Sequence, residues 1–405
     1  MNVVLFDDEW RVNLLPLTYT RPSAAIRIGI LTIAEKWEKH LNAKVSFKTT
    51  AYLSQKFPAV IESSNIFING RYLPDKDLIE QIQNLSPEEM VMDGDKVVAC
   101  HLNSDEAHDF LKDNVSLANH QELNFKGRFS HISKCPDVFA LNGIELESDF
   151  AVITQGRISA QPSATNQLIS PERIFIEPGA MVECSVLNAS AGSIYIGKDS
   201  EVMEGSLVRG PFALGEHSHL KMGAKIYGAT TIGPHCKVGG EVSNCVIFGY
   251  TNKAHDGFIG NSVIGEWCNL GADTNTSNLK NNYAEVKLWN YPAEKYLKTG
   301  LQFCGTIMGD HSKCGINTMF NTGTIIGVSA NVFGGGFPRN FIPDFSWGGA
   351  QGFETYALSK AFEVGNMVMH RRGLELNEVE KNILTYVFNE TQKYRVWENS
   401  IKISV

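Results

Sequence analysis

The chain has 405 residues, of which 43% are hydrophobic and 20% are charged, and its formal net charge is −8. One hydrophobic core rarely extends over so long a chain, so we expect two or three domains. The acidic balance argues against a nucleic-acid partner, because phosphate backbones bind basic surfaces. No apolar stretch reaches the length that spans a bilayer, and residues 1–10 are too acidic for a signal peptide. We therefore expect no membrane partner.

The eight cysteines form no CxxC pair and show no regular spacing. This usage is typical of reduced thiols and predicts a cytoplasmic protein. His311 and Cys314 stand three residues apart in "HSKC", which could indicate a metal site. A surface histidine beside a buried cysteine explains the same spacing more simply.

The first 154 residues alternate apolar runs with amphipathic segments. In chain order the predicted elements are a strand at "NVVLF" (2–6), a helix at 31–41, a strand at 64–70, a helix at 75–85 and a strand at 95–102. Such alternation predicts an α/β domain over residues 1–154. Residues 155–172 are rich in Pro, Ser and Gln and are expected to form a linker.

The middle of the chain carries an internal repeat of six residues. Apolar residues recur at this interval from Ile196 to Val238, then through Val246, Phe258, Ile264 and Leu270, and again from Met308 to Val332. Glycine follows many of these positions. A period of six matches neither a helix nor a simple strand, but it fits a coil of three short faces that each point one aliphatic inward. Residues 173–345 are therefore predicted to form a left-handed parallel β-helix of hexapeptide repeats.

Two segments lie outside this repeat. Residues 274–300 are polar and aperiodic, so a loop is expected to leave the coil there. Residues 346–405 are predicted to contain two helices, at 354–371 and 376–395, that cap the open end of the coil.

"WRVNLLPLTYTRPSAAIRIGI" (10–30) resembles the opening of the sugar-1-phosphate nucleotidyltransferase/acetyltransferase family, of which N-acetylglucosamine-1-phosphate uridylyltransferases are members. The resemblance implies a nucleotidyltransferase-like domain in which Arg11 and Arg21 contact phosphate and aspartates hold Mg²⁺. Two departures stand out. Ser23 replaces a lysine of the family, and Asn69-Gly70-Arg71 replaces its metal-binding Gly-Asp.

Asp7 and Asp8 follow the first predicted strand. They could hold a metal in a rearranged site, or they could belong to a capping or solvated loop. The sequence does not decide which residues of this domain would bind a metal, or whether the domain is active.

"AHDGFIGNSVIGEWCNLGADTNTSN" (254–278) is similar to the acetyltransferase stretch of the same family. The resemblance implies acetyl-CoA as acyl donor, His255 as general base, and Asn269 and Asn278 as sugar-contacting and orienting residues. Ala272 would lie along the acyl-donor groove.

The same stretch departs from the family in ways that bear on the substrate. Phe258 replaces a tyrosine, so a hydroxyl that could touch substrate phosphate is missing, and Asp273 adds a negative charge. Lys280 could supply a cation that the family places elsewhere. We expect Phe258 and Lys280 to contact the substrate.

The residues themselves leave two explanations for His255. The sixfold frame places inward side chains at 252 and 258, so His255 lies outside the core and could be a plain surface residue. An imidazole is also the side chain suited to take a proton near neutral pH. His217, His219 and His235 do not have the spacing of the zinc-binding histidines of some β-helix enzymes.

Together these features predict a sugar-phosphate or nucleotide-sugar transferase. Acetyl transfer from acyl-CoA to an amino-sugar phosphate is expected in the β-helix, with a homotrimer as the assembly and Mg²⁺ as a possible cofactor of the first domain. One alternative is a sugar-1-phosphate nucleotidyltransferase with a structural β-helix. Another is a non-catalytic nucleotide-sugar-binding scaffold.

Overall fold

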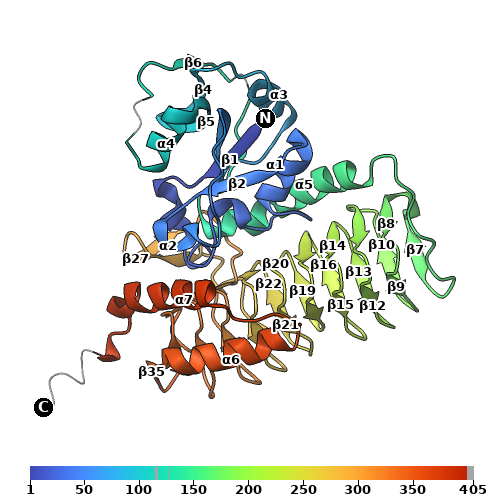
Figure 1. The fold of residues 1–405 in the computed structure, drawn as a ribbon. Helices are drawn as coiled ribbons and strands as arrows, with labels where there is room; N and C mark the ends of the chain where they lie inside the picture. Colours follow the sequence, from blue (N-terminus) through green and yellow to red (C-terminus); the bar gives the residue numbers. More distant parts are fainter. Residues whose placement is uncertain (115–116, 126, 399–405) are drawn as a thin grey trace, which may run out of the picture. The chain divides into compact units, whose positions relative to one another are not determined.

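The computed structural model describes residues 1–114, 117–125 and 127–398, and it divides into two compact units (Figure 1). The first unit consists of residues 1–14, 20–26 and 31–133, and the second of residues 15–19, 27–30 and the chain from Lys134 onward. This division does not coincide with the domain boundary expected at residue 154, because helix α5 (Cys135–Thr154) belongs to the second unit.

The first unit is built on a six-stranded sheet with the order β2-β1-β3-β5-β4-β6. Strand β1 pairs in parallel with β2 and β3, β5 is antiparallel to both β3 and β4, and β6 is parallel to β4. The elements are β1 (Asn2–Phe6), α1 (Ile33–Leu41), β2 (Val45–Lys48), α2 (Ala51–Ser54), β3 (Ser64–Asn69), α3 (Lys76–Gln83), β4 (Glu89–Asp93), β5 (Lys96–Asn103), α4 (Ser104–Leu111) and β6 (Gln121–Leu123). The predicted α/β domain is confirmed.

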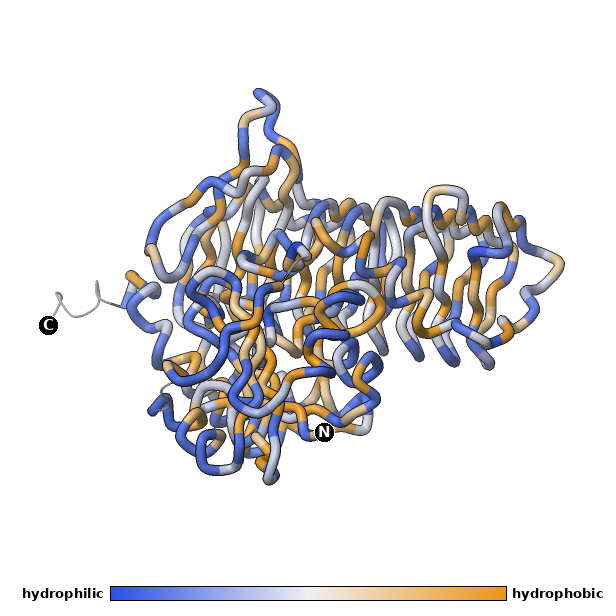
Figure 2. The backbone as a smooth tube through the Cα atoms, turned by 90° about the horizontal axis from the view of Figure 1, so that it is seen from above, coloured by the Kyte–Doolittle hydropathy of each residue, from blue (hydrophilic) through white to orange (hydrophobic). Residues whose placement is uncertain are grey.

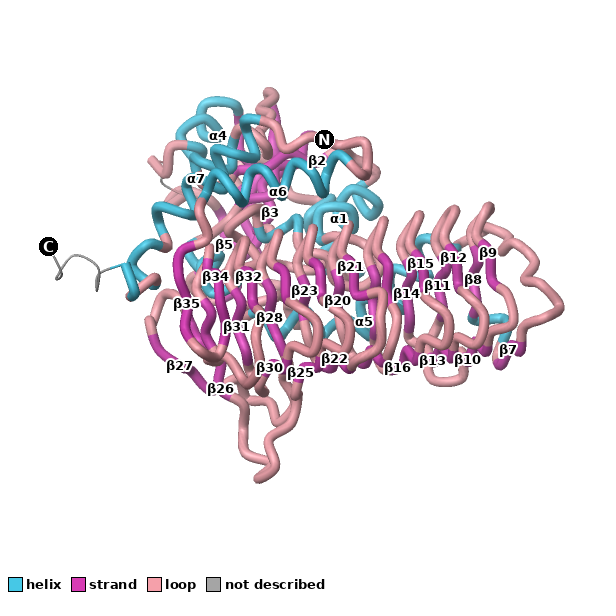
Figure 3. The backbone as a smooth tube through the Cα atoms, turned by 90° about the horizontal axis from the view of Figure 1, so that it is seen from below, coloured by secondary structure: helices cyan, strands magenta, loops and turns pink. Residues whose placement is uncertain are grey.

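The second unit is a left-handed parallel β-helix, as predicted (Figures 1 and 3). Its six-stranded face consists of β7 (Gln167–Ile169), β10 (Val186–Asn188), β13 (Leu207–Arg209), β16 (Lys225–Tyr227), β19 (Glu241–Ser243) and β22 (Phe258–Gly260). Its nine-stranded face consists of β8 (Ile174–Ile176), β11 (Ile194–Ile196), β14 (Phe212–Leu214), β17 (Thr230–Ile232), β20 (Val246–Ile247), β23 (Val263–Ile264), β28 (Thr306–Met308), β31 (Thr324–Ile326) and β33 (Phe341–Ile342). Its ten-stranded face consists of β9 (Met181–Val182), β12 (Glu201–Val202), β15 (His219–Leu220), β18 (Lys237–Val238), β21 (Asn252–Lys253), β24 (Asn269–Leu270), β29 (Lys313–Cys314), β32 (Asn331–Val332), β34 (Ser346–Gly349) and β35 (Gly352–Thr355).

The core of the β-helix is a stack of inward aliphatic side chains, and hydrophobic segments recur along its coils in Figure 2. The predicted inward positions hold from Ile196 to Val238. Between Val238 and Ile264 the expected frame is wrong, because some faces there are shorter than six residues, but it holds again at Ile264, at Leu270 and from Met308 to Val332. Val242, Ile247 and Ile259 belong to the core, in place of the expected Val246 and Phe258.

The segment expected as a loop at 274–300 contains regular structure. It starts with β25 (Asn275–Thr276), which pairs with β30 (Met319–Phe320), and continues into an antiparallel hairpin of β26 (Lys287–Asn290) and β27 (Lys295–Lys298). Strand β7 lies inside the expected linker and pairs with β10, so the coil already includes residues before 173.

The two predicted C-terminal helices are α6 (Leu358–His370) and α7 (Glu378–Glu390). They run alongside the coils in Figures 1 and 3. At the end of the coil, β35 folds back antiparallel on β34, and Phe353 in β35 packs against the core. The hairpin thus covers core surface that the helices were expected to cap. None of the helices in the described residues combines the length and apolarity needed to cross a membrane.

Candidate functional sites

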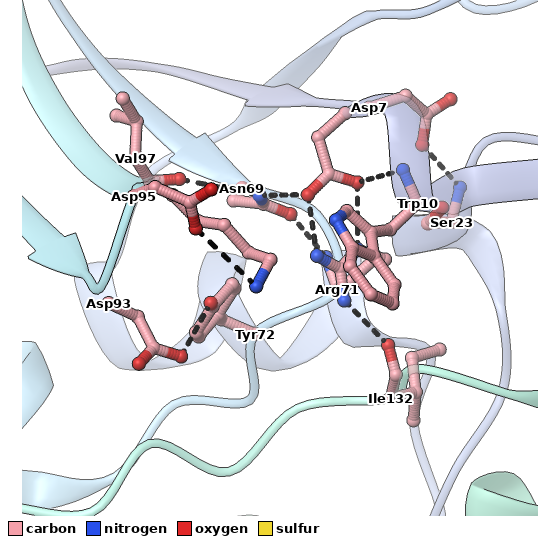
Figure 4. Close-up of polar contacts among 12 residues, drawn as sticks. Asp7, Trp10, Ser23, Asn69, Arg71, Tyr72, Asp93, Asp95, Val97 and Ile132 are labelled. Atoms are coloured by element: carbon pink, nitrogen blue, oxygen red, sulfur yellow. Dashed lines mark hydrogen bonds and ion pairs between the residues drawn. The ribbon is translucent and has the colours of Figure 1, made fainter.

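In the first unit, polar residues gather where the parallel strands end. Asp7 and Asp8 follow β1, Thr49 follows β2, and Asn69 ends β3. Ligands of open α/β sheets bind at the carboxyl ends of such strands, so this edge is a candidate ligand site. Figure 4 shows the cluster around Asn69 and Arg71.

Asp8 is fully engaged by Arg71. Nε of Arg71 donates to Oδ1 of Asp8 at 2.8 Å, and a second guanidinium nitrogen donates to Oδ2 at 2.5 Å. Asn69 also donates to Asp8, at 2.9 Å. Burial tends to raise the pKa of Asp8, but the hydrogen bond and positive charge of Arg71 outweigh it and lower that pKa. The Asp8 carboxylate is therefore held ionised inside a two-pronged ion pair.

Asp7 is engaged by different groups. Its Oδ1 accepts from the amide of Ser23 at 2.8 Å, its Oδ2 accepts from the hydroxyl of Thr49 at 2.6 Å, and Nε of Arg11 lies 3.3 Å away. Burial raises the pKa of Asp7, and the charge of Arg11 only partly offsets this. Arg11 also donates to the Tyr52 hydroxyl at 2.8 Å.

Arg11 and Arg21, the two predicted phosphate ligands, are both buried in the first unit. Arg11 is 5% exposed and Arg21 is 4% exposed. Phosphate contact by either guanidinium remains a prediction.

These residues do not fit a Mg²⁺ ion. Both oxygens of Asp8 are bonded to Arg71, and both oxygens of Asp7 accept hydrogen bonds. Within residues 1–114, 117–125 and 127–398, no three His, Cys, Asp or Glu side chains come together to hold a metal. Hard cations such as Mg²⁺ bind carboxylate oxygens that are open to them. We therefore derive no step through a metal at this edge.

In the second unit, His255 lies at an exposed corner between β21 and β22. Backbone hydrogen bonds connect this corner to the preceding coil and to the following coil. Lys253 O accepts from the amide of Gly239 at 2.8 Å, and Asp256 O accepts from the amide of Asp273 at 3.0 Å. The imidazole is thus presented to solvent from a rigid turn.

Lys253 supports this corner from inside the coil. It is 1% exposed and occupies the inward position that Val238 fills one coil earlier. Its ammonium group donates to the backbone oxygen of His255 and, at 3.1 Å, to that of Asp256. The aliphatic stem thus fills the core, while the charged end caps two carbonyl groups of the corner.

The buried amine makes stability depend on pH. Burial lowers the pKa of Lys253 to about 8, from an ordinary value of 10.5. Because the folded state then binds this proton less tightly than the unfolded chain, the free energy of unfolding should gain a contribution that rises as the pH increases from about 8 to 10.5. We expect Lys253→Met to remove that contribution.

Urea unfolding of the wild type, Lys253→Met and Lys225→Met across this pH range checks the prediction. Lys225 is an exposed lysine of β16 and serves as the control. Parallel curves for the wild type and Lys253→Met would contradict it.

Asn269 and Ala272 lie one coil further on. Asn269, in β24, accepts a hydrogen bond from Nδ2 of Asn252 at 2.9 Å, so the two amides form a short ladder on the ten-stranded face. Ala272 belongs to the corner directly beside that of His255, as the hydrogen bond from Asp273 to Asp256 shows. The carboxylate of Asp273 accepts from Asn275 at 3.1 Å.

Phe258 and Asn278 come together over Gly260. A Cβ atom at Gly260 would lie 2.6 Å from Cζ of Phe258 and 2.5 Å from Nδ2 of Asn278, so both side chains cover this glycine. Asn278 also donates to Oδ1 of Asn261 at 2.8 Å. His255 precedes β22 and Asn261 follows it, so one strand separates His255 from Asn278 within the chain. Lys280 donates to the backbone oxygen of Glu285 at 3.2 Å.

A cavity of about 620 Å³ lies next to Asn261. Its lining includes the amides of Asn244, Asn261 and Gln302, together with the ring of Phe303 and one side of α5. Amides and an aromatic ring offer the hydrogen bonds and the apolar surface that a sugar requires. Sequence reasoning missed Asn244 and Asn261, because the glycine spacing does not mark this corner.

The histidines weighed as zinc ligands have other contacts. His217 and His235 stack at 4.9 Å between ring centroids, and His235 stacks on Tyr250 at 4.8 Å. His219 pairs with Glu201 at 2.8 Å. The first two belong to a column of corner rings, and the third to the outer surface of the ten-stranded face.

The fold defines a class of protein in which an α/β domain is joined to a hexapeptide β-helix. Residues 3–158 match the family model described as sugar nucleotidyl transferase. The chain is also similar to the bifunctional protein GlmU of Picosynechococcus sp., at 28% identity over 161 residues, covering 39% of this chain and 29% of that protein. GlmU of Gloeobacter violaceus is 34% identical over 99 residues, which are 24% of this chain and 19% of that protein. These similarities confirm the resemblance seen in the sequence.

The chain thus spans less than a third of the length of these curated relatives. Among solved structures, an Arabidopsis UDP-N-acetylglucosamine acyltransferase aligns with 16% identity and a TM-score of 0.25, over 53% of this chain and 80% of that chain. A likeness of that size carries no information on function.

Proposed function

We propose that the protein is a sugar-phosphate or nucleotide-sugar transferase whose β-helix transfers an acetyl group from acetyl-CoA to an amino-sugar phosphate. The observation that carries the proposal is the exposed corner of His255, which lies on a rigid coil beside the corner of Ala272 and Asp273. The match of residues 3–158 to sugar nucleotidyl transferases supports a sugar phosphate or nucleotide sugar as the substrate.

In the proposed reaction, the amine nitrogen of the sugar attacks the thioester carbonyl carbon. The C–N bond forms, the C–S bond breaks, and the thiolate leaves with the electron pair of that bond. The imidazole of His255 accepts the proton that the amine loses, and the leaving thiolate takes up a proton. Backbone amides of neighbouring corners and the amides of Asn269 and Asn278 are suited to orient the sugar and to stabilise the oxyanion.

Within one chain, β22 separates His255 from Asn278. We propose that a neighbouring copy completes the cleft at His255 in a homotrimer, since closed cyclic assemblies are common among such proteins. Arg11 and Arg21 are proposed to contact phosphate in the first unit, and Lys280 and Phe258 to contact the substrate in the second. We further propose that the protein acts in the cytoplasm.

A two-channel assay tests this function. Purified full-length protein is offered acetyl-CoA, nucleoside triphosphates and a panel of amino sugars and sugar 1-phosphates, while thiol and pyrophosphate release are followed separately. We expect thiol release with an amino-sugar phosphate. Pyrophosphate release without thiol release would contradict the proposal and favour a nucleotidyltransferase with a structural β-helix. Silence in both channels would favour a non-catalytic scaffold.

A further inference from the structure

The end of the β-helix carries a pocket that neither cluster above uses. Its volume is about 840 Å³, within the range of small-molecule sites. Four segments converge to form it: the β26–β27 hairpin, residues 339–343 at β33, the turn between β34 and β35, and the chain around η4 (Gln392–Tyr394). Figures 1 and 3 show β27 and β35 at the same end of the coil.

The walls of the pocket are aromatic. Trp289 stacks on Phe341 with 4.4 Å between ring centroids and an angle of 11° between the rings. Tyr296 meets Trp289 edge-on at 5.5 Å, and Tyr394 meets Phe341 edge-on at 5.6 Å. Such surfaces accept a flat ring by stacking or by edge contact.

A buried layer fixes these rings in place. Tyr291 packs edge-on against both Phe341 and Tyr394, at 5.5 and 5.4 Å. Its hydroxyl donates to Oδ2 of the buried Asp344 at 3.2 Å, and Asp344 Oδ1 accepts from the amide of Val328 at 2.6 Å. A ligand would therefore meet walls that are already ordered.

The charges at the pocket favour an anion. Arg339 is exposed and has no hydrogen bond or ion pair among the described residues, but its charge acts on the hydroxyl of Tyr296. Lys393 lies over the ring of Tyr394 and pairs with Glu294 at 2.6 Å. The pair is neutral as a whole, so Arg339 leaves the pocket with a net positive charge. Guanidinium groups bind phosphate with paired hydrogen bonds.

We propose that this pocket binds a nucleotide. The heteroaromatic base lies against the Trp289 and Tyr394 walls, and the phosphate lies at Arg339 and Lys393. Glu294 is placed to accept hydrogen bonds from the sugar hydroxyls. Free nucleotides, nucleotide sugars and the adenosine phosphate end of coenzyme A all carry this combination of base, sugar and phosphate. The inference does not depend on the proposed acetyl transfer.

Titration of the full-length protein with UMP, AMP and coenzyme A tests the inference, with calorimetry and tryptophan fluorescence as readouts. We expect at least one of the three to bind and to quench fluorescence, and we expect the matching nucleoside without phosphate to bind at least about tenfold more weakly. If coenzyme A binds and neither mononucleotide does, the ligand of this pocket is the acyl donor. No binding of any of the three would overturn the proposal.

Variants locate the binding within the chain. Arg339→Gln should weaken it at least about tenfold, whereas Arg209→Gln, a matched change at an exposed arginine of β13, should not. Trp289→Phe should reduce the quenching, whereas Trp347→Phe, at an exposed tryptophan of β34 that does not line the pocket, should keep it. Nucleotide binding by the first unit would persist in Arg339→Gln, so equal titrations of the wild type and Arg339→Gln would overturn the proposal. Binding that appears only in a chain ended at Glu398 would also overturn it.

Discussion

Replacing His255 by alanine should lower the rate of thiol release from acetyl-CoA by at least about 100-fold. This is the lower part of the range for loss of a general base, and the amine has no other imidazole at this corner to receive its proton. The side chain is exposed, so the change should leave the thermal unfolding temperature nearly unaltered. We therefore expect a variant that loses activity but keeps its thermal stability.

The matched control is His370→Ala, which removes an exposed histidine at the end of α6. Its rate of thiol release should equal that of the wild type. Thiol release that is unchanged in His255→Ala would remove His255 from the reaction, and the exposed corner would then have a purely structural role.

Replacing Arg71 by alanine should destabilise the first unit by about 3–5 kcal/mol, the range for breaking a buried ion pair from one side. Arg71 is 1% exposed, and the change leaves the half-buried Asp8 carboxylate without its cation. Hydrogen exchange of the β1 and β3 amides and urea unfolding both measure this loss.

Two further variants show whether the pair itself is responsible. Asp8→Asn combined with Arg71→Met removes both charges and should recover much of the lost stability. Arg128→Ala removes an exposed arginine of the same unit and should change stability by less than about 0.5 kcal/mol. A loss below about 1 kcal/mol in Arg71→Ala would show that the ion pair contributes little.

Much of the fold could be predicted from the sequence because the sixfold period reports directly which side chains point inward. The prediction held from Ile196 to Val238, where every face has the same length, and again at Ile264, at Leu270 and from Met308 to Val332. It slipped at Val242, where the coil shortens, and the error moved Phe258 into the core and Asn252 into the place of Lys253. Nothing in a hydrophobic count suggests that a lysine fills an inward position, because its charged end must first find the carbonyl groups of His255 and Asp256.

The contacts of the first unit were harder to anticipate. Asp8 and Arg71 stand 63 residues apart, and only the parallel pairing of β1 with β3 brings the ends of these strands together. The sequence showed that Asn69-Gly70-Arg71 replaces a metal-binding pair, but it could not show that the guanidinium of Arg71 would engage the remaining carboxylate. The pocket at the end of the coil was missed for the same reason, since Trp289, Arg339 and Tyr394 meet only after three separate segments have folded.

The Arg71 pair bears on which half of the protein carries the proposed chemistry. A carboxylate that is bound to a guanidinium on both oxygens is not open to a divalent cation, so the chemistry we propose is assigned to the β-helix. In the first unit, Thr49 and Arg11 contact Asp7 at the sheet edge where ligands bind in α/β folds.

The most direct test of the central claim is mass spectrometry of the product formed by the full-length protein from acetyl-CoA and an amino-sugar phosphate. We predict an acceptor that has gained one acetyl group, formed in equal amount to the free thiol, and lost when His255 is replaced by alanine. If no amino sugar of the panel gains an acetyl group while the same protein releases pyrophosphate from a nucleoside triphosphate and a sugar 1-phosphate, the assignment of acetyl transfer to the β-helix is wrong.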